Sequence, residues 1–164
     1  MINKLIMENA KNKHKNISTA WIDYKKGYDS VPHDWIIDTL QIHKFDATIT
    51  NFFQSTMTDW RTSLTLPHNN GQISTEKFAI NTGIYQGDCP SGTLFILSLL
   101  PLSWLLKESK LGYRITKEIT ISHLLFMDDL KLYASNDQQL KSQINIVKTF
   151  SDDIRMSFGI DKCQ

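Results

Sequence analysis

The chain has 164 residues, of which 41% are apolar and 21% are charged, and its formal net charge at pH 7 is +1. These proportions are typical of one globular domain, or of part of a larger protein, with a sizeable core. Such a small net charge excludes a strong global field for attracting a polyanion, so any nucleic-acid site has to be local. Cys89 and Cys163 are too few for a disulfide framework or a four-ligand zinc site, which favours a reducing, intracellular compartment, nuclear or cytoplasmic.

No segment of the sequence is suited to a membrane or to export. The longest apolar stretch, Thr93 to Leu106, is interrupted by two serines and a proline. It is also shorter than the roughly 20 residues that a membrane-spanning helix needs. Neither end has the basic and then apolar pattern of a signal peptide. We therefore expect a buried helix over 93–106 and no membrane partner.

The first part of the chain predicts one strand among helices. Residues 1–16 are typical of a short polar helix, and the alternation over Thr19–Tyr24 predicts a strand with Asp23 near its end. Helices are predicted over about 32–43 and 47–60. The apolar residues of the second helix recur at helical spacing and are therefore assigned to the core: Ile49, Phe52, Phe53, Met57 and Trp60.

The middle of the chain predicts a hairpin and then a glycine-rich loop. Residues 63–66 and 75–80 are the predicted strands, joined by the polar tip Pro67–Gly71. The stretch from Gly83 to Gly92 then leads into the apolar helix. Closely spaced glycines let a substrate approach the backbone, although turns before helices are often glycine-rich for structural reasons alone.

Two adjacent carboxylates, Asp128 and Asp129, come directly after an apolar run. Strands are predicted over 111–115 and 119–127, and period-two alternation resumes after the aspartates, which indicates strand, tight turn, strand. Neighbouring carboxylates repel one another and resist burial unless a cation compensates them. The pair is thus either a divalent metal site or a solvated acidic turn.

The last long element is an amphipathic helix marked by apolar residues from Leu140 to Ile154. The capping pattern Ser135-x-x-Gln138 is predicted to begin it and Gly159 to close it. The final residues resemble the start of another strand.

Taken in this order, three segments resemble the palm of a reverse transcriptase of the non-LTR retrotransposon type. Motif A corresponds to about 19–33, including Ala20 to His33; motif B corresponds to about 83–106, beginning with Gly83 to Asp88. Motif C corresponds to about 123–134, with Phe126-Met127-Asp128-Asp129 at its centre. A weaker match to motif D covers about 137–163 and ends in Phe158-Gly159-Ile160-Asp161-Lys162.

The resemblance implies that residues 1–164 are a partial reverse transcriptase domain. The implied fold class is α+β: a polymerase palm with an antiparallel sheet covered by helices, part of the fingers, and no thumb. The implied reaction transfers a nucleotide from a deoxynucleoside triphosphate to the 3′ hydroxyl of a DNA primer on an RNA template. Asp23, Asp128 and Asp129 would be the catalytic residues and would hold two Mg²⁺ ions, or Mn²⁺ in their place.

Further roles follow from the resemblance at four positions. Tyr28 would pack beneath the incoming sugar and reject a 2′ hydroxyl, unless it is only a core tyrosine. Gln86 and Gly87 would border the pocket for nucleotide and template. Lys162 would donate a proton to the leaving pyrophosphate, unless it is a surface lysine.

The chain departs from the family pattern in its residues and in its extent. Gly27 stands where alanine is usual, and Pro90-Ser91-Gly92 stands where Leu-Ser-Pro is common. The finger strands and thumb have no counterpart in these residues, so we expect little or no primer extension from this chain alone. The alternative function is a catalytically inactive remnant that at most binds metal or nucleic acid. No segment of the sequence specifies an oligomeric state.

Overall fold

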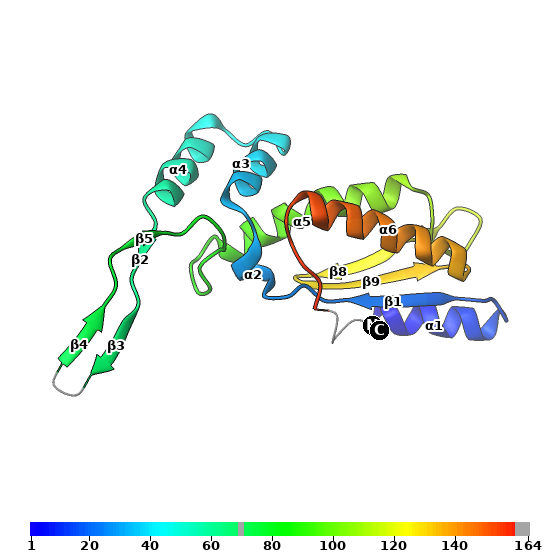
Figure 1. Cartoon of the computed structure of the whole chain (residues 1–164). Coiled ribbons are helices and arrows are strands. Elements are labelled where there is room, and N and C mark those ends of the chain that lie inside the picture. Colours follow the sequence, from blue (N-terminus) through cyan, green and yellow to red (C-terminus); the bar gives the residue numbers. More distant parts are fainter. Residues whose placement is uncertain (69–70, 160–164) are drawn as a thin grey trace.

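A computed structural model of the chain describes residues 1–68 and 71–159. It shows a layered body built around one sheet, and an arm of helices and short strands that extends away from it (Figure 1). Within the described residues, no helix is both long and apolar enough to cross a membrane.

The centre of the body is a three-stranded antiparallel sheet in the order β1, β9, β8. The strands are β1 (Ser18–Ile22), β8 (His123–Phe126) and β9 (Asp129–Ala134). In this register Ile22 of β1 lies opposite Leu130 of β9. Strand β8 pairs with the other side of β9, which confirms the predicted strand, tight turn, strand around the aspartates.

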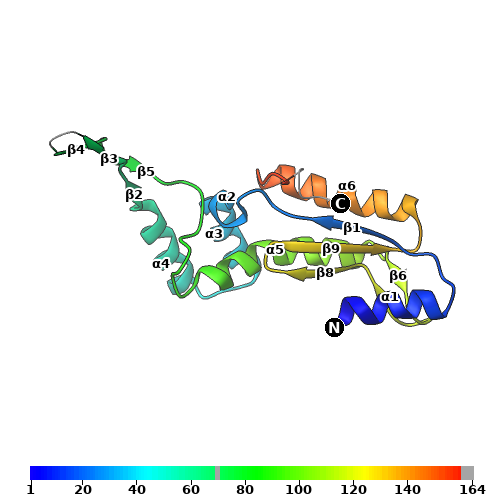
Figure 2. The same cartoon turned by 90° about the horizontal axis from the view of Figure 1, so that it is seen from below.

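Helices lie on both faces of the sheet rather than on one. Helices α5 (Ser91–Glu108) and α6 (Asp137–Asp153) cover one face, and α1 (Ile2–Asn12) lies against the other (Figures 1 and 2). Because successive side chains of a strand point to opposite faces, β9 contributes to two cores. Leu132 belongs to the main core with the two long helices. Tyr133 belongs to a smaller core with α1.

Three short elements complete the body: α2 (Gly27–Ser30), β6 (Tyr113–Arg114) and β7 (Thr120–Ile121). The last two form a small antiparallel hairpin. They correspond to the strands predicted over 111–115 and 119–127, but both are shorter, and the second predicted strand is divided between β7 and β8.

The arm consists of two helices and two short strand pairs: α3 (His33–Ile42), α4 (Ala47–Thr58), β2 (Arg61–Thr62), β3 (Thr65–His68), β4 (Gly71–Ser74) and β5 (Phe78–Ala79). Strand β3 pairs with β4, and β2 pairs with β5. The β3–β4 ribbon is the most distant part of the arm (Figure 1).

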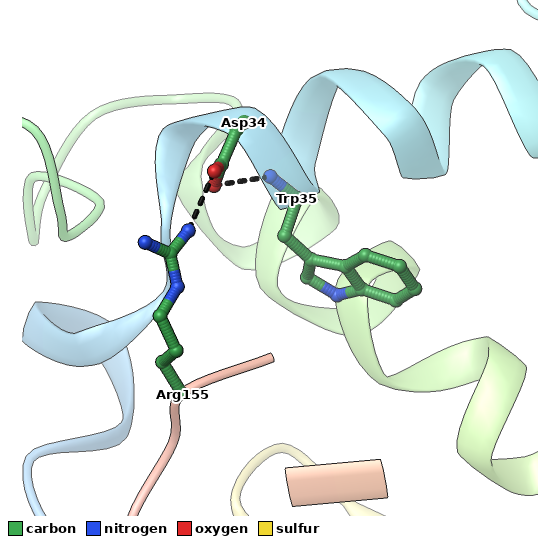
Figure 3. A network of polar contacts seen from close by, with 3 residues as sticks. All are labelled: Asp34, Trp35 and Arg155. Carbon is green, nitrogen blue, oxygen red and sulfur yellow. Dashed lines mark hydrogen bonds and ion pairs between the residues drawn. The ribbon is translucent and has the colours of Figure 1, made fainter. Parts of the chain in front are cut away.

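Helix α3 is attached to the body through polar and aromatic contacts. The Trp35 indole N–H donates to the carbonyl of Ser98 in α5 at 3.0 Å, and its ring lies edge-on to Phe150 of α6. Next to it, the Asp34 carboxylate accepts from the backbone N–H of Trp35 and from Arg155, just beyond α6 (Figure 3). The arm therefore begins on a helix that contacts both long helices.

Two predictions about the arm are wrong in part. Ile49 and Phe52 of α4 are 42% and 63% exposed, although helical spacing assigned them to the core. The other three assigned side chains do contact the core, with Met57 fully inside it. The hairpin is shifted from the prediction: its strands are β3 and β4, which starts at Gly71, whereas 75–80 supplies only β5, which pairs with β2 instead.

The predicted ends of α6 are also wrong. The cap is shifted by one residue, since the Asn136 side chain accepts from Gln139 N–H at 2.9 Å and the Gln139 side chain accepts from Ser135 N–H. The helix ends at Asp153, and Arg155 then adopts a left-handed conformation with φ of 59°. This residue takes the place that glycine usually has after a helix.

Candidate active site

The two acidic segments meet at one end of the sheet. Asp23 directly follows Ile22 at the end of β1, whereas Asp129 directly precedes Leu130 at the start of β9. Since Ile22 and Leu130 are paired in antiparallel register, the two aspartates come at the same end of neighbouring strands. Asp128 lies in the turn between β8 and β9, beside them.

The turn that carries Asp128 has an unusual backbone. Phe126 pairs with Asp129, so only Met127 and Asp128 connect the strands. Met127 has a φ of 53°, in the left-handed region that residues other than glycine adopt rarely. Glycine or asparagine is the common choice for this position in a two-residue turn. The turn therefore places a bulky side chain where a purely connecting loop would have a small one.

The backbone after Asp23 is held by the segment that follows α6. The Asp23 carbonyl accepts from the N–H of Gly159 at 2.8 Å, and Tyr24 forms a bridge with Phe158. The Tyr24 hydroxyl lies 3.0 Å from the hydroxyl of Ser151, and burial raises the pKa of Tyr24 to about 12. The sequence did not predict these contacts between the end of β1 and the segment after α6, although Phe158 and Gly159 fall within the predicted motif D.

The three aspartates differ in exposure. Asp23 and Asp128 are half-buried, and Asp129 is exposed. Within residues 1–68 and 71–159, no three His, Cys, Asp or Glu side chains are arranged to hold a metal ion together. The backbone thus brings the predicted ligands to one end of the sheet.

Tyr28 connects all three motifs. Its ring stacks on Phe95 of α5 with centroids 4.5 Å apart and planes inclined by 9°. Its hydroxyl lies 3.8 Å from the Met127 sulfur in the aspartate turn. The sequence places Phe95 in an apolar helix and Met127 in motif C, but it does not show that Tyr28 contacts either side chain.

The start of the motif B loop is fastened to α2 and α3. The N–H groups of Gly83 and Ile84 donate to the carbonyls of Val31 and Tyr28, both at 2.8 Å. The His33 ring nitrogen Nε2 lies 2.9 Å from the carbonyl oxygen of Gly83. These bonds set the position of the loop relative to Tyr28.

Gln86 and Gly87 lie further along this loop and are exposed. Gly87 has a φ of 101°, and a Cβ added to it would meet no atom within 4 Å. Its backbone conformation, rather than crowding, therefore favours glycine. The remaining predicted site residue, Lys162, lies outside the described residues.

The sheet and its two acidic segments are the parts of the chain on which the resemblance to reverse transcriptases rested. The family model for reverse transcriptase (RNA-dependent DNA polymerase) matches residues 2–164, so the chain belongs to this family.

Curated relatives come from R2 retrotransposons. The chain is 28% identical over 151 residues to a Pol polyprotein from a type-1 R2 element of Popillia japonica, covering 92% of the chain and 24% of the relative. It is 30% identical over 153 residues to that from the type-2 element R2DM of Drosophila melanogaster, covering 92% and 14%. The chain thus spans a quarter or less of these relatives.

Solved structures of telomerase share the fold. Apo telomerase from Candida tropicalis aligns with a TM-score of 0.69 at 14% identity, over 99% of this chain and 31% of that one. Telomerase from Candida albicans, in complex with a fragment of telomeric RNA, aligns with a TM-score of 0.67 at 11% identity, over 99% and 30%. At these identities the likeness concerns the fold alone.

Proposed function

We propose that this chain is the catalytic core of a retrotransposon RNA-directed DNA polymerase. It adds deoxynucleotides to the 3′ hydroxyl of a DNA primer along an RNA template. The observation that carries the proposal is the meeting of Asp23, Asp128 and Asp129 at one end of the sheet, with Tyr28 beside the turn. Family membership and the R2 relatives support the same reaction.

Asp23 and Asp128 are the proposed ligands of two Mg²⁺ ions, with Asp129 as an auxiliary acid, and Mn²⁺ can replace Mg²⁺. Carboxylate oxygens are the ligands that Mg²⁺ prefers, so the donor set fits the ion. The side chains are not gathered into a three-ligand group in the described residues. Binding therefore requires them to turn toward one another, which a cation favours by removing their mutual repulsion. When bound, the ions would activate the primer hydroxyl and stabilise the leaving pyrophosphate.

Tyr28 is the proposed sugar selector. Its ring is held on one side by Phe95 and its hydroxyl is held by Met127, so it has little freedom to yield to a larger sugar. In an active enzyme, Tyr28→Ala should raise ribonucleotide use relative to deoxynucleotide use by about 10-fold to 200-fold. This is the range of discrimination that a difference of one small group in a pocket usually gives. Tyr28→Phe keeps the ring and should keep the discrimination. Equal discrimination by all three proteins would show that the tyrosine only packs.

Gln86, Gly87 and Lys162 complete the proposed substrate site. Gln86 and Gly87 are exposed on a loop fastened to the residues around Tyr28, which suits the border of a pocket for nucleotide and template. Lys162 is proposed to donate a proton to pyrophosphate. Membership of the family of RNA-dependent DNA polymerases supports RNA as the template.

The test of this function uses a chimera, because the chain spans 24% of its Popillia japonica relative. The chain replaces the matching 151 residues of that polyprotein, and the purified chimera receives an annealed RNA template, a DNA primer, deoxynucleotides and Mg²⁺. We expect template-dependent extension that Asp128→Asn lowers by on the order of a hundredfold or more, since reacting groups then lose their positions. The matched control is Asp153→Asn, an exposed aspartate at the end of α6.

The competing function is a catalytically inactive chain that at most binds metal or nucleic acid. A folded chimera that extends no primer, while the unmodified relative does, would support it. Extension that survives Asp128→Asn would contradict the proposed site in a different way, because the aspartate would then not be needed.

A further inference from the structure

Basic side chains gather at the end of the sheet opposite to the aspartates. This end is marked by the paired residues Ser18 and Ala134, where β1 begins and β9 ends. The C-terminal end of α1 and strand β6 lie there (Figure 2), and α5 ends shortly before β6. The Ser135 hydroxyl, just after β9, donates to the carbonyl of Gly112 at 2.9 Å, so the β6–β7 hairpin is attached to this end of the sheet.

Three segments at this end, 11–15, 107–110 and 113–121, are here named the basic end. They contain seven of the eighteen lysine and arginine residues of the chain, but two of its seventeen acidic residues. Asp137, at the start of the neighbouring helix α6, accepts a hydrogen bond from Ser18. Positive charge is therefore concentrated at one place, although the net charge of the whole chain is +1. Such a local concentration attracts polyanions.

The basic end contains a cleft of about 380 Å³. Its cations are Lys107 and Lys110 from the end of α5 and Arg114 from β6. Thr120 adds a hydroxyl group to the lining, and Glu118 adds a carboxylate. Within residues 1–68 and 71–159, none of the three cations forms an ion pair. Because like charges in one cleft repel one another, an anion that enters it is favoured.

Two lysines from the N-terminal segment extend the basic end beyond the cleft. Lys15 Nζ donates to the carbonyl of Arg114 at 2.9 Å, and Lys13 Nζ donates to that of Ile115 at 3.4 Å. An ammonium group has three N–H donors, so each lysine keeps donors for a further acceptor. These bonds hold cations from two distant parts of the sequence on one surface.

We propose that the basic end is a second nucleic-acid site, which holds a phosphate backbone away from the aspartates. Strand β9 connects the two ends with six residues, which places them roughly 17 Å apart at a rise of about 3.4 Å per residue. That distance is several nucleotides along a stacked strand, which advances about 3.4 Å per nucleotide. The basic end therefore contributes affinity and not chemistry, and the inference does not depend on the proposed reaction.

Nucleic acid fits this surface better than an acidic protein does. Lysine, arginine and hydroxyl side chains are those that contact phosphate oxygens. Phosphate charges also follow one another at every nucleotide, so several cations on one surface are neutralised at once. The chain belongs to a family of RNA-dependent DNA polymerases, whose reaction involves both RNA and DNA. Since these two share the phosphate backbone, the experiment tests each of them.

The test measures how the complete 164-residue chain binds short labelled single strands of RNA and of DNA by fluorescence anisotropy. Lys107→Gln/Lys110→Gln/Arg114→Gln should lower the affinity by about tenfold to a hundredfold near 0.1 M salt, because three phosphate contacts are lost. The slope of log affinity against log salt should fall by about 2, at about 0.7 for each contact. A loss with either strand supports the site, and the strand that loses more is its ligand. All three side chains are exposed, so the variant should fold, as circular dichroism would verify.

The matched control removes three positive charges from exposed positions outside the basic end: Lys44→Gln/Lys77→Gln/Lys148→Gln. We expect its affinity and its salt slope to stay close to those of the wild type. An equal loss in the two triple variants would show a general effect of net charge and would overturn the site. A wild-type chain that binds polyglutamate as tightly as RNA would also overturn it, in favour of an acidic protein partner.

The outcomes separate this site from the proposed function. Unchanged binding in Lys107→Gln/Lys110→Gln/Arg114→Gln would overturn the second site and leave the polymerase reaction intact. A chimera that extends no primer would refute the reaction, whereas the loss of binding in the same triple variant would still support the basic end. A wild-type chain that binds neither RNA nor DNA would overturn the inference outright.

Discussion

Strand β9 and the β3–β4 ribbon are both antiparallel, yet their surroundings are opposite. Every residue of β9 after Asp129 is buried, whereas every residue of β3 and β4 is exposed, including Leu66 and Ile73. The central strand has a neighbour on each edge and helices on each face. Each strand of the ribbon has one partner strand, and no layer from residues 1–68 or 71–159 covers it, an arrangement that is marginal on its own in water. Apolar alternation therefore indicates a strand in both places, but only the layers around it produce a core.

The residues of the proposed site are likewise divided between a buried region and an exposed one. Its aspartates and Tyr28 come from the body, where backbone positions are held by paired strands and buried helices. Gln86 and Gly87 come from the loop between arm and body, fastened at its start and exposed further along. The proposed metal ligands and sugar selector therefore come from the region with paired strands and a buried core.

The sharpest test of this comparison removes one leucine from each region. Leu132→Ala in β9, where the side chain is fully buried, should lower the free energy of unfolding by about 2 to 5 kcal/mol. Leu66→Ala in β3, where the side chain is 67% exposed, should change it by about 0.5 kcal/mol or less. Urea unfolding of the two variants measures both values. Similar losses would mean that the ribbon is covered in solution.

A second test concerns Tyr24, whose contacts with Ser151 and Phe158 hold the backbone after Asp23. Burial raises the pKa of Tyr24 from 10.0 to about 12, so the folded chain keeps this proton to a higher pH than the unfolded chain. The stabilisation is fully present below pH 10.0 and is lost as the pH rises toward about 12. In Tyr24→Phe this loss, roughly 2 to 3 kcal/mol, should disappear from the pH profile of unfolding. An unchanged profile would place the hydroxyl in solvent.

A third test uses His123 on the edge strand of the body. Burial, with a smaller contribution from the charge of Lys107, lowers the pKa of His123 from 6.5 to about 4. The unfolded chain therefore binds this proton first, so the stabilisation is present above pH 6.5 and is lost as the pH falls toward about 4. His123→Gln should flatten the profile in this window by about 1 to 2 kcal/mol, allowing for solvent screening. A profile as steep as that of the wild type would contradict burial of the ring.

The smallest effect is expected at the ion pair between arm and body. Arg155 and Asp34 are both about two-thirds exposed, so their attraction should contribute less than about 1 kcal/mol. Arg155→Gly loses the pair but relieves the left-handed backbone, and we expect little net change in unfolding. Arg155→Ala loses the pair without that relief and should be less stable than the glycine variant by about 1 kcal/mol. The reverse order would show that the ion pair dominates.

The residues alone indicated the main helices, the strand before Asp23 and the turn at Asp128, because these depend on periodicity and on neighbours in the chain. The motifs likewise stood in recognisable order along the sequence. Local sequence patterns gave the wrong ends for α6. The structure uses Asn136 rather than Ser135 as the N-terminal cap, and Arg155 adopts the left-handed conformation that was expected of a glycine.

Burial in the arm and the contacts inside the site were decided by tertiary structure. Ile49 and Phe52 have core-like spacing on α4, but within the described part of the chain no layer covers that side of the helix, so they are exposed. Gly27 could be read only as a departure from the usual alanine. The fold shows what surrounds it, since a Cβ at this position would lie 3.2 Å from Cζ of Phe95, which comes from a distant helix, and 3.4 Å from Cβ of Asp128 in the turn. Such contacts join segments far apart in the chain, and only close packing determines which side chain fills which space.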